Sequence, residues 1–361
     1  SDDLDVGTPQ ARLRTAARTV WSREARAQLR DEVRRWRPDV MHVHNTFPVL
    51  SPAALHAGHD VGVPVVQTLH NYRVPCAAAT LLRDGRPCLD CVGGSKLPAV
   101  WHACYHDSRS QSLVTAAMQT VHCWSGTYHV AVDAYIALTS FMRDVMIREG
   151  LPGDRIHVAP NVLTDAPTEG ALLQAGPAPR RFAFVGRLSP EKGADLLLRA
   201  WTQLELPGWS LDVVGDGPDE ASLRALVADR DDVRFHGWCE RDRVRAILAG
   251  ARALVLPSRW FEGFPITLLE SLATGRPVIA SDHGAFTDTV VEGRSGWRFA
   301  AGDDRALAQR LAQVARLPGD VWQAACLRAR AEFDAHYGPA MGYARLRGIY
   351  DAALERFARR G

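Results

Sequence analysis

The sequence lacks any apolar run of about eighteen residues, the length a helix needs to cross a bilayer. It also lacks the basic and then apolar pattern of a secretory signal. The net charge is only +2, which gives no reason to expect nucleic acid as a partner. With 361 residues, 47% hydrophobic and 23% charged, the composition is that of a globular protein of about two domains.

Cysteine is scarce, and the seven cysteines do not suit the disulfide framework of a small secreted domain. We therefore expect a cytoplasmic protein. Cys88, Cys91 and Cys104 lie in one irregular segment with His102 and His106. A C-x2-C pair followed by Cys and His can close a zinc site that pins such a segment. Because a second C-x2-C half is absent, we favour unligated cysteines and predict no metal.

Basic residues gather in the first forty positions. Apolar residues there, including Leu13, Val33 and Trp36, recur at helical spacing and predict one helix from Thr8 to Arg37 with arginines on its other faces. We interpret this helix as packed on one side and solvated on the other. The alternative is peripheral contact with the anionic inner face of a membrane.

Two apolar segments, 39–45 and 63–69, read as buried strands with a helix between them from Ser51. Strand, helix and strand imply a parallel sheet with right-handed crossovers. His44 ends the first strand and His70 follows the second. Since ligands bind at the carboxyl ends of parallel strands, His70 is a candidate for the reacting centre, and His44 is a weaker one.

The middle of the chain continues this alternation. A helix is predicted over 108–128, with Leu113 and Trp124 on its apolar face, and further strands at 133–138 and 156–162. Residues 164–180 are rich in Pro, Gly and Ala without a sustained period, which is typical of a linker. The predicted domains are an N-terminal one at 1–163, the linker at 164–180, a C-terminal one at 181–338, and a final helix at 339–361 that crosses back.

The C-terminal domain opens with a strand at 181–185, the turn GRLSPEKG and a helix from Ala194. The turn is neither G-x-G-x-x-G nor a Walker sequence, which argues against NAD and against ATP-type phosphoryl transfer. Arg187 and Lys192 instead supply two positive charges that can hold a diphosphate as it leaves.

The richest stretch is 254–270, LVLPSRWFEGFPITLLE. It passes from a strand end through a loop into a helix, with Pro265 suited to the first helical turn. A helix start after a strand attracts anions, because its free N–H groups and positive dipole end face the ligand. Glu262 on the loop and Glu270 in the helix, eight positions apart, suit the binding of hydroxyl groups.

Together, P-S-x-x-x-E-G-x-P with its E-x7-E spacing and G-R-L-x-x-E-K-G resemble the retaining glycosyltransferases of family 4, also called glycosyl transferases group 1. The likeness covers roughly 38–352 and is densest over 183–297. It implies the GT-B fold, an α/β architecture of two doubly wound Rossmann-like domains facing across a cleft. It also implies a nucleotide-diphosphate sugar as donor, a hydroxyl acceptor, and no separate cofactor.

The resemblance also implies residue roles. Glu262 and His70 would face the reacting sugar, Arg187 and Lys192 the diphosphate, and Glu270 the ribose. The catalytic candidates are therefore His70, Glu262, Arg187 and Lys192. The other donor-binding candidates, several of them through the backbone, are Gly186, Gly237, Trp238, Gly263, Phe264, Pro265, Ile266, Thr267 and Leu268. We expect front-face displacement, in which the leaving diphosphate takes the acceptor's proton.

One part of the family pattern has no counterpart: the first strand and its Gly-rich turn are missing before Thr8. We expect an upstream segment that the sequence omits, the alternative being an incomplete first domain. Two other functions stay open, a non-catalytic nucleotide-sugar-binding partner and a UDP-sugar 2-epimerase of the same fold. Polysaccharide biosynthesis is the expected setting, with a glycan, lipid-linked or small-molecule acceptor; the sugar, base, linkage and oligomeric state are left open.

Overall fold

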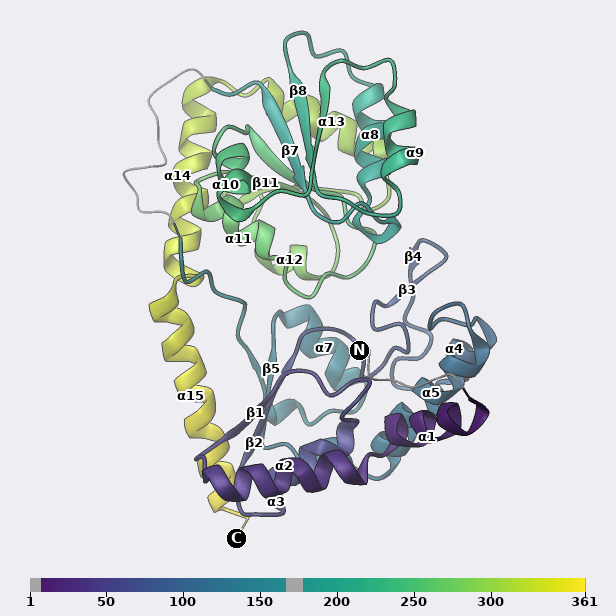
Figure 1. The fold of residues 1–361 in the computed structure, drawn as a ribbon. Helices are drawn as coiled ribbons and strands as arrows, with labels where there is room; N and C mark the ends of the chain where they lie inside the picture. Colours follow the sequence, from purple (N-terminus) through teal and green to yellow (C-terminus); the bar gives the residue numbers. More distant parts are fainter. Residues whose placement is uncertain (1–7, 167–177, 361) are drawn as a thin grey trace. The chain divides into compact units, whose positions relative to one another are not determined.

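The computed structural model describes residues 8–166 and 178–360, which form two compact units (Figure 1). Among the described residues, the first unit contains 8–83, 88–160 and 343–360, and the second contains 84–87, 161–166 and 178–342. The predictions about the chain before Thr8 and about the centre of the linker, 167–177, fall outside the described residues.

The first unit is built on four parallel strands in the order β1-β2-β5-β6. These strands are β1 (Met41–Val43), β2 (Val65–Leu69), β5 (Ala134–Ala137) and β6 (Ile156–Val158). Strands β2 and β5 are buried along their whole length, as expected for apolar runs covered on both faces. The final helix α15 (Pro339–Ala358) closes one face by packing Ile349 and Ala353 against Val66 and Ile136.

Helices and short irregular segments surround this sheet (Figure 1). They are α1 (Pro9–Val20), α2 (Arg23–Trp36), η1 (Pro52–Leu55), α3 (His56–His59), β3 (Leu82–Arg83), α4 (Leu97–Trp101), α5 (Arg109–Trp124), α6 (Thr127–Val130), α7 (Ser140–Arg148) and η2 (Gly153–Arg155). The short strand β4 (Arg86–Pro87) falls in the range 84–87, which is counted with the second unit. None of the helices in the described part of the chain is long and apolar enough to span a bilayer.

The single helix predicted over Thr8–Arg37 is wrong, because the chain breaks into α1 and α2 at Trp21. Trp21 is extended and stacks on His122, with ring centroids 4.8 Å apart. Ser22 then caps α2 by accepting a hydrogen bond from the Ala25 N–H at 3.1 Å. Its own N–H donates to Ser51 Oγ at 2.8 Å, so the break is tied to the start of η1.

Periodicity chose the wrong buried side for α1 and α5, whereas on α2 the predicted Val33 is buried and Trp36 is exposed. Leu13 and Trp36 are 73% and 75% exposed, and on α5 Trp124 is 91% exposed. The side of α5 that turns inward is largely polar, and its buried groups find partners. Gln119 Nε2 donates to Arg73 O at 2.7 Å, and His122 bonds the Val20 carbonyl at 2.7 Å. Hydrogen bonding therefore decides the orientation of α5 over the apolar pattern.

The second unit is a doubly wound domain with six parallel strands in the order β12-β11-β10-β7-β8-β9. Strand numbering within the unit gives the order 3-2-1-4-5-6 of a Rossmann fold, as predicted. The strands are β7 (Arg181–Val185), β8 (Ser210–Val214), β9 (Val233–Gly237), β10 (Ala253–Leu256), β11 (Val278–Ser281) and β12 (Gly296–Phe299).

Helices cover both faces of this sheet (Figure 1). Helices α8 (Ala194–Thr202) and α13 (Asp304–Ala315) lie on one side, and α10 (Arg241–Ala249), α11 (Ile266–Ala273) and α14 (Gly319–His336) lie on the other. The remaining elements are η4 (Pro190–Lys192), α9 (Glu220–Leu226) and α12 (Ala285–Thr289). Trp201 and the inward rings of β7 form the centre of the apolar core.

Candidate active site

The strand order of the second unit identifies where a ligand site belongs. The order reverses between β7 and β10, so the loops that follow these two strands diverge to opposite faces and leave a crevice. The loop after β7 carries Arg187 and Lys192, and the loop after β10 carries Glu262. Two of the motifs found in the sequence therefore meet at one topological switch point.

A charged pair links these two loops. Lys192 Nζ lies 2.9 Å from Glu262 Oε1 and 3.1 Å from Oε2, and Ser258 Oγ donates to Oε1 at 2.7 Å. The Glu262 side chain is 6% exposed, whereas that of Lys192 is 26% exposed. Lys192 Nζ also lies 5.1 Å from the centroid of a Trp260 ring. The carboxylate is thus enclosed, and the ammonium keeps one side open to solvent.

Two glycines hold the loops in close contact. Gly193 follows Lys192 with φ +70°, and a Cβ there would lie 2.1 Å from the Pro257 carbonyl oxygen. Gly215 has φ +128°, and its Cβ would lie 2.0 Å from the Gly186 carbonyl oxygen. No side chain fits at either position, so the turn carrying Lys192 packs backbone to backbone against its neighbours.

Arg187 is the second cation of this turn. It is exposed, and its guanidinium makes no ion pair or hydrogen bond with other residues in the described ranges 8–166 and 178–360. Nearby Arg259 differs, because it is held by Asp195 through contacts of 2.5 and 2.7 Å. Arg187 is therefore the guanidinium at this switch point whose donors are open to an anion.

The helix after Glu262 begins one residue later than predicted. Pro265 is extended, with ψ 126°, and serves as the residue before α11 rather than as part of its first turn. No side chain caps the helix, so its first N–H groups are open to a ligand. Leu268 is fully buried.

Glu270 lies on α11 and is nearly enclosed. Burial raises the pKa of its carboxyl, while Arg241, whose Nε lies 3.8 Å from Oε1, opposes this shift. The other predicted donor contacts surround these elements, with Gly263 partly exposed, Phe264 buried, Ile266 exposed and Thr267 partly exposed. At the end of β9, Gly237 is followed by Trp238, which is 70% exposed and free to stack on a flat ligand.

Two residues of this unit were missed as site candidates. Asn161 donates through Nδ2 to the Phe264 carbonyl at 3.1 Å and so supports the loop before α11. His283 Nε2 donates to the Ser258 carbonyl at 2.7 Å, and burial lowers the pKa of this imidazole. His283 follows β11, so the strand-end argument that singled out His70 could have found it.

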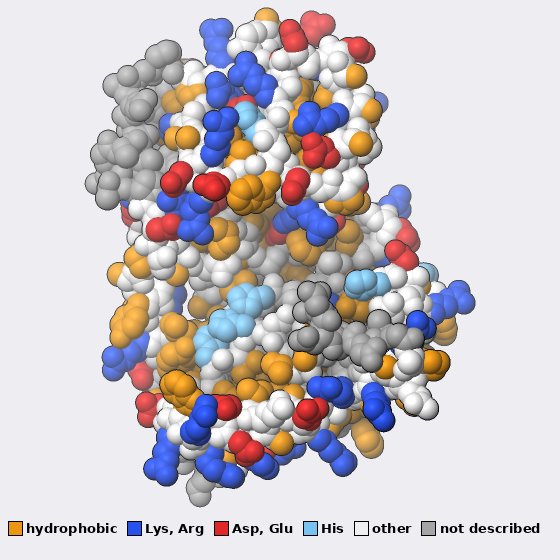
Figure 2. Space-filling view, in the orientation of Figure 1, with side chains coloured by type: hydrophobic (Ala, Val, Ile, Leu, Met, Phe, Trp, Pro, Cys, Tyr) orange, Lys and Arg blue, Asp and Glu red, His pale blue; other side chains and the backbone are white. Residues whose placement is uncertain are grey.

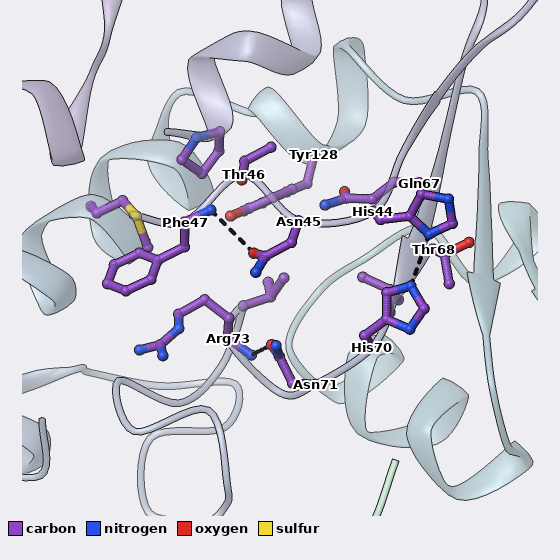
Figure 3. Close-up of a pocket in the computed structure, with 14 residues that line it drawn as sticks. His44, Asn45, Thr46, Phe47, Gln67, Thr68, His70, Asn71, Arg73 and Tyr128 are labelled. Carbon is purple, nitrogen blue, oxygen red and sulfur yellow. Dashed lines mark hydrogen bonds between the residues drawn. The ribbon is translucent and has the colours of Figure 1, made fainter. Parts of the chain in front are cut away.

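In the first unit, the predicted histidines form a row. His44 Nδ1 and His70 Nε2 are 2.8 Å apart, and the rings of His42 and His44 stack with centroids 4.4 Å apart. Imidazoles in contact are visible on this face in Figure 2, and His44 and His70 are drawn in Figure 3. Burial and the neighbouring His44 lower the pKa of His70, which favours its neutral form. Its role at a reacting sugar stays a prediction.

The cysteine segment also belongs to the first unit. Cys76, which the sequence analysis left out, lines one small cavity together with Cys88, Cys91 and Cys104. All of these thiols are free, and burial raises the pKa of Cys104 to about 11. In the described residues, no group of three or more His, Cys, Asp or Glu is arranged so that it could hold a metal ion. The absence of a metal remains a prediction.

Two family models match the chain over nearly its whole length. Residues 4–164 match "Glycosyltransferase Family 4", and residues 173–325 match "Glycosyl transferases group 1". Among solved structures, a glycosyltransferase from Rickettsia africae is 14% identical, with a TM-score of 0.67 over 97% of this chain and 83% of that one. HepE of Anabaena in complex with UDP is 17% identical, with a TM-score of 0.64 over 91% and 82%.

Curated relatives are more alike in sequence. The amylovoran biosynthesis glycosyltransferase AmsK of Erwinia amylovora is 29% identical over 63% of this chain and 57% of its own length. The putative colanic acid biosynthesis glycosyltransferase WcaL of Salmonella typhimurium is 30% identical over 50% and 47%. The chain thus spans about half the length of these relatives. The phosphatidyl-myo-inositol mannosyltransferase of Mycobacterium leprae is 30% identical over 69% of this chain and 66% of its own.

The first family model ends at residue 164, four residues after the first unit gives way to the second at 160. The second model covers both the Lys192 turn and the Glu262 loop. The GT-B architecture of two Rossmann-like domains agrees with the solved structures. The chain therefore belongs to the family 4 glycosyltransferases.

Proposed function

We propose that the chain transfers a sugar from a nucleotide-diphosphate donor to a hydroxyl group of a glycan, lipid-linked or small-molecule acceptor, with retention of anomeric configuration. The observation that carries the proposal is the Lys192–Glu262 pair at the switch point of the second unit, where the ammonium keeps an open side. Exposed Arg187 and the uncapped start of α11 add to the positive potential there. A diphosphate fits this set of donors.

The contacts of Glu262 argue against a double displacement. A retaining enzyme that forms a glycosyl intermediate needs two free carboxylates about 5 Å apart across the sugar. Glu262 is instead bound by Lys192 and Ser258. In the proposed mechanism, the acceptor oxygen bonds to the anomeric carbon on the face from which the diphosphate leaves. The hydroxyl proton passes to the departing phosphate oxygen, and His70 hydrogen-bonds at the reacting sugar.

In this scheme the protein's own cations stabilise the charge on the leaving diphosphate. Arg187 and Lys192 are closest to the charge that develops on the leaving diphosphate, so their interactions strengthen in the transition state. Glu270 accepts from the ribose hydroxyls, and Trp238 stacks beside the base. No divalent ion is required by this arrangement. A cytoplasmic location, and a peripheral contact of basic α2 with a membrane, stay predictions.

The relatives suggest which ligands to test first. AmsK is named for amylovoran biosynthesis and WcaL for colanic acid biosynthesis, and the HepE structure contains UDP. Calorimetry with UDP, GDP and ADP, and with their glucose, mannose, galactose and N-acetylglucosamine forms, is the direct test. We expect tight binding of one nucleotide, weakened by Glu270→Ala in a sample that melts as wild type does. Binding of none of these ligands would overturn the proposal.

A further inference from the structure

The first unit contains a polar cavity beside the histidine row (Figure 3). The space between its lining atoms is about 420 Å³ when the open mouth is included. The lining includes His44 and His70 at one side and Asn71 and Arg73 from the segment after β2. Gln67, from within β2, also lines it. Neither glutamate nor aspartate is among the lining residues.

Arg73 is a cation without a carboxylate partner among the described residues. Its guanidinium carbon lies 4.1 Å from the Phe47 ring centroid and 5.0 Å from that of Tyr105, and Nη1 donates to the Ala77 carbonyl. Burial lowers the pKa of Arg73, and the groups that oppose this shift are a phenol and a thiol, Tyr105 and Cys76. A charge held out of water in this way is stabilised when an anion binds it.

The second group that lacks a partner is the side-chain oxygen of Gln67. Gln67 is only 6% exposed, yet its Oε1 accepts no hydrogen bond from the described residues. A buried acceptor without a partner is unfavourable until a donor reaches it, and a sugar hydroxyl is such a donor. Figure 3 shows Gln67 on the far side of the cavity from Arg73, with Asn45 between them.

The asparagines leave further donors in the cavity. Asn45 Oδ1 accepts from the Phe47 N–H at 3.1 Å, and Asn71 Oδ1 accepts from the Arg73 N–H at 3.0 Å. Both carbonyl oxygens are therefore used within the protein, which leaves the two amide NH2 groups available. The cavity thus offers one cation and several neutral donors, with a single unpartnered buried acceptor, a composition that favours a ligand with an anionic group and hydroxyls.

We propose that this cavity is an acceptor subsite for an acidic sugar, whose carboxylate or phosphate binds Arg73 while one of its hydroxyls donates to Gln67. This inference rests on the proposed function, because it names the class of acceptor used by the same enzyme. In this proposal Arg73 contacts the substrate and determines specificity for an acidic group. A glycosyl chain bearing uronic acids or phosphate substituents carries the required group.

A purely structural role for Arg73 makes a different prediction. If the guanidinium only stabilises its own segment through the hydrogen bond to Ala77, Arg73→Gln lowers the stability of the protein and weakens the binding of all sugars equally. If it binds an anion, the variant loses the distinction between charged and neutral ligands. The two roles therefore separate in a comparison of ligands rather than in the loss of any one activity.

The experiment measures dissociation constants by ligand-observed NMR for methyl glucuronide, glucose 1-phosphate and neutral methyl glucoside. We expect the wild type to bind at least one acidic probe about tenfold or more tightly than the glucoside, and Arg73→Gln to abolish that preference. Gln67→Leu should weaken acidic and neutral probes together. Arg83→Gln is the matched control, because Arg83 lies on the same segment but pairs with Asp90 at 2.7 Å.

The acidic probe that binds more tightly shows whether the cavity prefers a carboxylate or a phosphate. Equal binding of all three probes to the wild type overturns the inference, and this result does not depend on any variant folding. A uniform loss in Arg73→Gln overturns it as well. Calorimetry with UDP, GDP and ADP on the same samples keeps the two proposals apart. Nucleotide binding without an acidic preference refutes only the subsite, and an acidic preference without nucleotide binding refutes only the proposed transfer.

Discussion

The chain contains only two lysines, and each is paired with a glutamate in a different unit. Lys96 and Glu149 in the first unit are 5% and 3% exposed, with Nζ 2.6 Å from Oε1. Further contacts also come from the protein, because Lys96 donates to the Cys91 carbonyl at 2.6 Å and Glu149 Oε2 accepts from the Gly93 N–H at 2.8 Å. In the second unit, Lys192 is 26% exposed over an enclosed Glu262.

The same two residue types therefore perform different tasks. Around Lys96 every contact comes from the protein, so the pair fastens the cysteine segment to the end of α7. Around Lys192 the protein supplies contacts on one side only, and the carboxylate holds the ammonium where a ligand can reach it. Exposure and the number of internal partners, rather than the identity of the pair, distinguish a structural contact from a site.

The largest effect is expected from breaking the closed pair. Lys96→Met leaves Glu149 buried without a cation and should lower the free energy of unfolding by about 3–5 kcal/mol. Urea denaturation followed by circular dichroism measures it. The double variant Lys96→Met with Glu149→Leu should recover most of the loss, because no charge is then buried. A decrease in the free energy of unfolding of less than about 1 kcal/mol would show that the pair does not hold the cysteine segment in place.

Breaking the open pair should instead affect turnover. Lys192→Ala is expected to lower kcat about 10²–10³-fold, the loss typical of removing one group that stabilises transition-state charge. Its melting temperature should stay close to that of the wild type, since Lys192 is partly solvated. Lys192→Arg is the control that keeps the charge and should retain more activity. Near-normal turnover in Lys192→Ala would refute the assignment.

A nucleotide should stabilise the two variants differently. At a concentration of about 100 times its dissociation constant, a ligand that binds only the folded protein adds about 2.7 kcal/mol to the free energy of unfolding. We expect this gain in the wild type and in Lys96→Met, and a smaller one in Lys192→Ala at the same concentration. Thermal unfolding with and without UDP, GDP or ADP measures it. Equal gains in all three proteins would remove Lys192 from the nucleotide site.

The smallest expected effect is on the pH dependence of the free energy of unfolding. Burial, with His44 and His70 nearby, lowers the pKa of His42 to about 4. The unfolded chain takes up a proton near the ordinary histidine pKa of about 6.5, before the folded chain does. Stability contributed by His42 is thus present above pH 6.5 and lost as the pH falls toward 4. Unfolding of His42→Gln should depend less on pH in this window; an unchanged slope would contradict the assignment.

Much of the second unit could be predicted because local sequence decides it. Strand β7 is apolar and the turn after it begins and ends with Gly, so periodicity and turn chemistry agree there, and the parallel sheet follows from the alternation of strand and helix. The Rossmann strand order was implied by the family resemblance. The proximity of Lys192 and Glu262 could be predicted only through the family resemblance. Their hydrogen bonds to each other join residues that are seventy positions apart in the sequence.

The first unit was harder to predict for a physical reason. The break at Trp21 depends on Ser51 and His122, which are distant in sequence, and no helical period reveals them. The inward side of α5 is chosen by hydrogen bonds of Gln119 and His122 rather than by apolar area. Arg73 gave no signal at all, because an unpaired cation can be recognised only after every neighbour is known.

The two glycine contacts at the switch point bear on how donor preference could be engineered. Gly193 packs against the Pro257 carbonyl, and Gly215 packs against the Gly186 carbonyl. The backbone conformations of these three chain segments therefore depend on one another. Grafting the loop of another transferase into one segment would place foreign backbone against the other two. A successful chimaera must exchange 186–193, the turn at 215 and the strand end at 257 as one cassette, whereas point changes at exposed Trp238 leave this frame untouched.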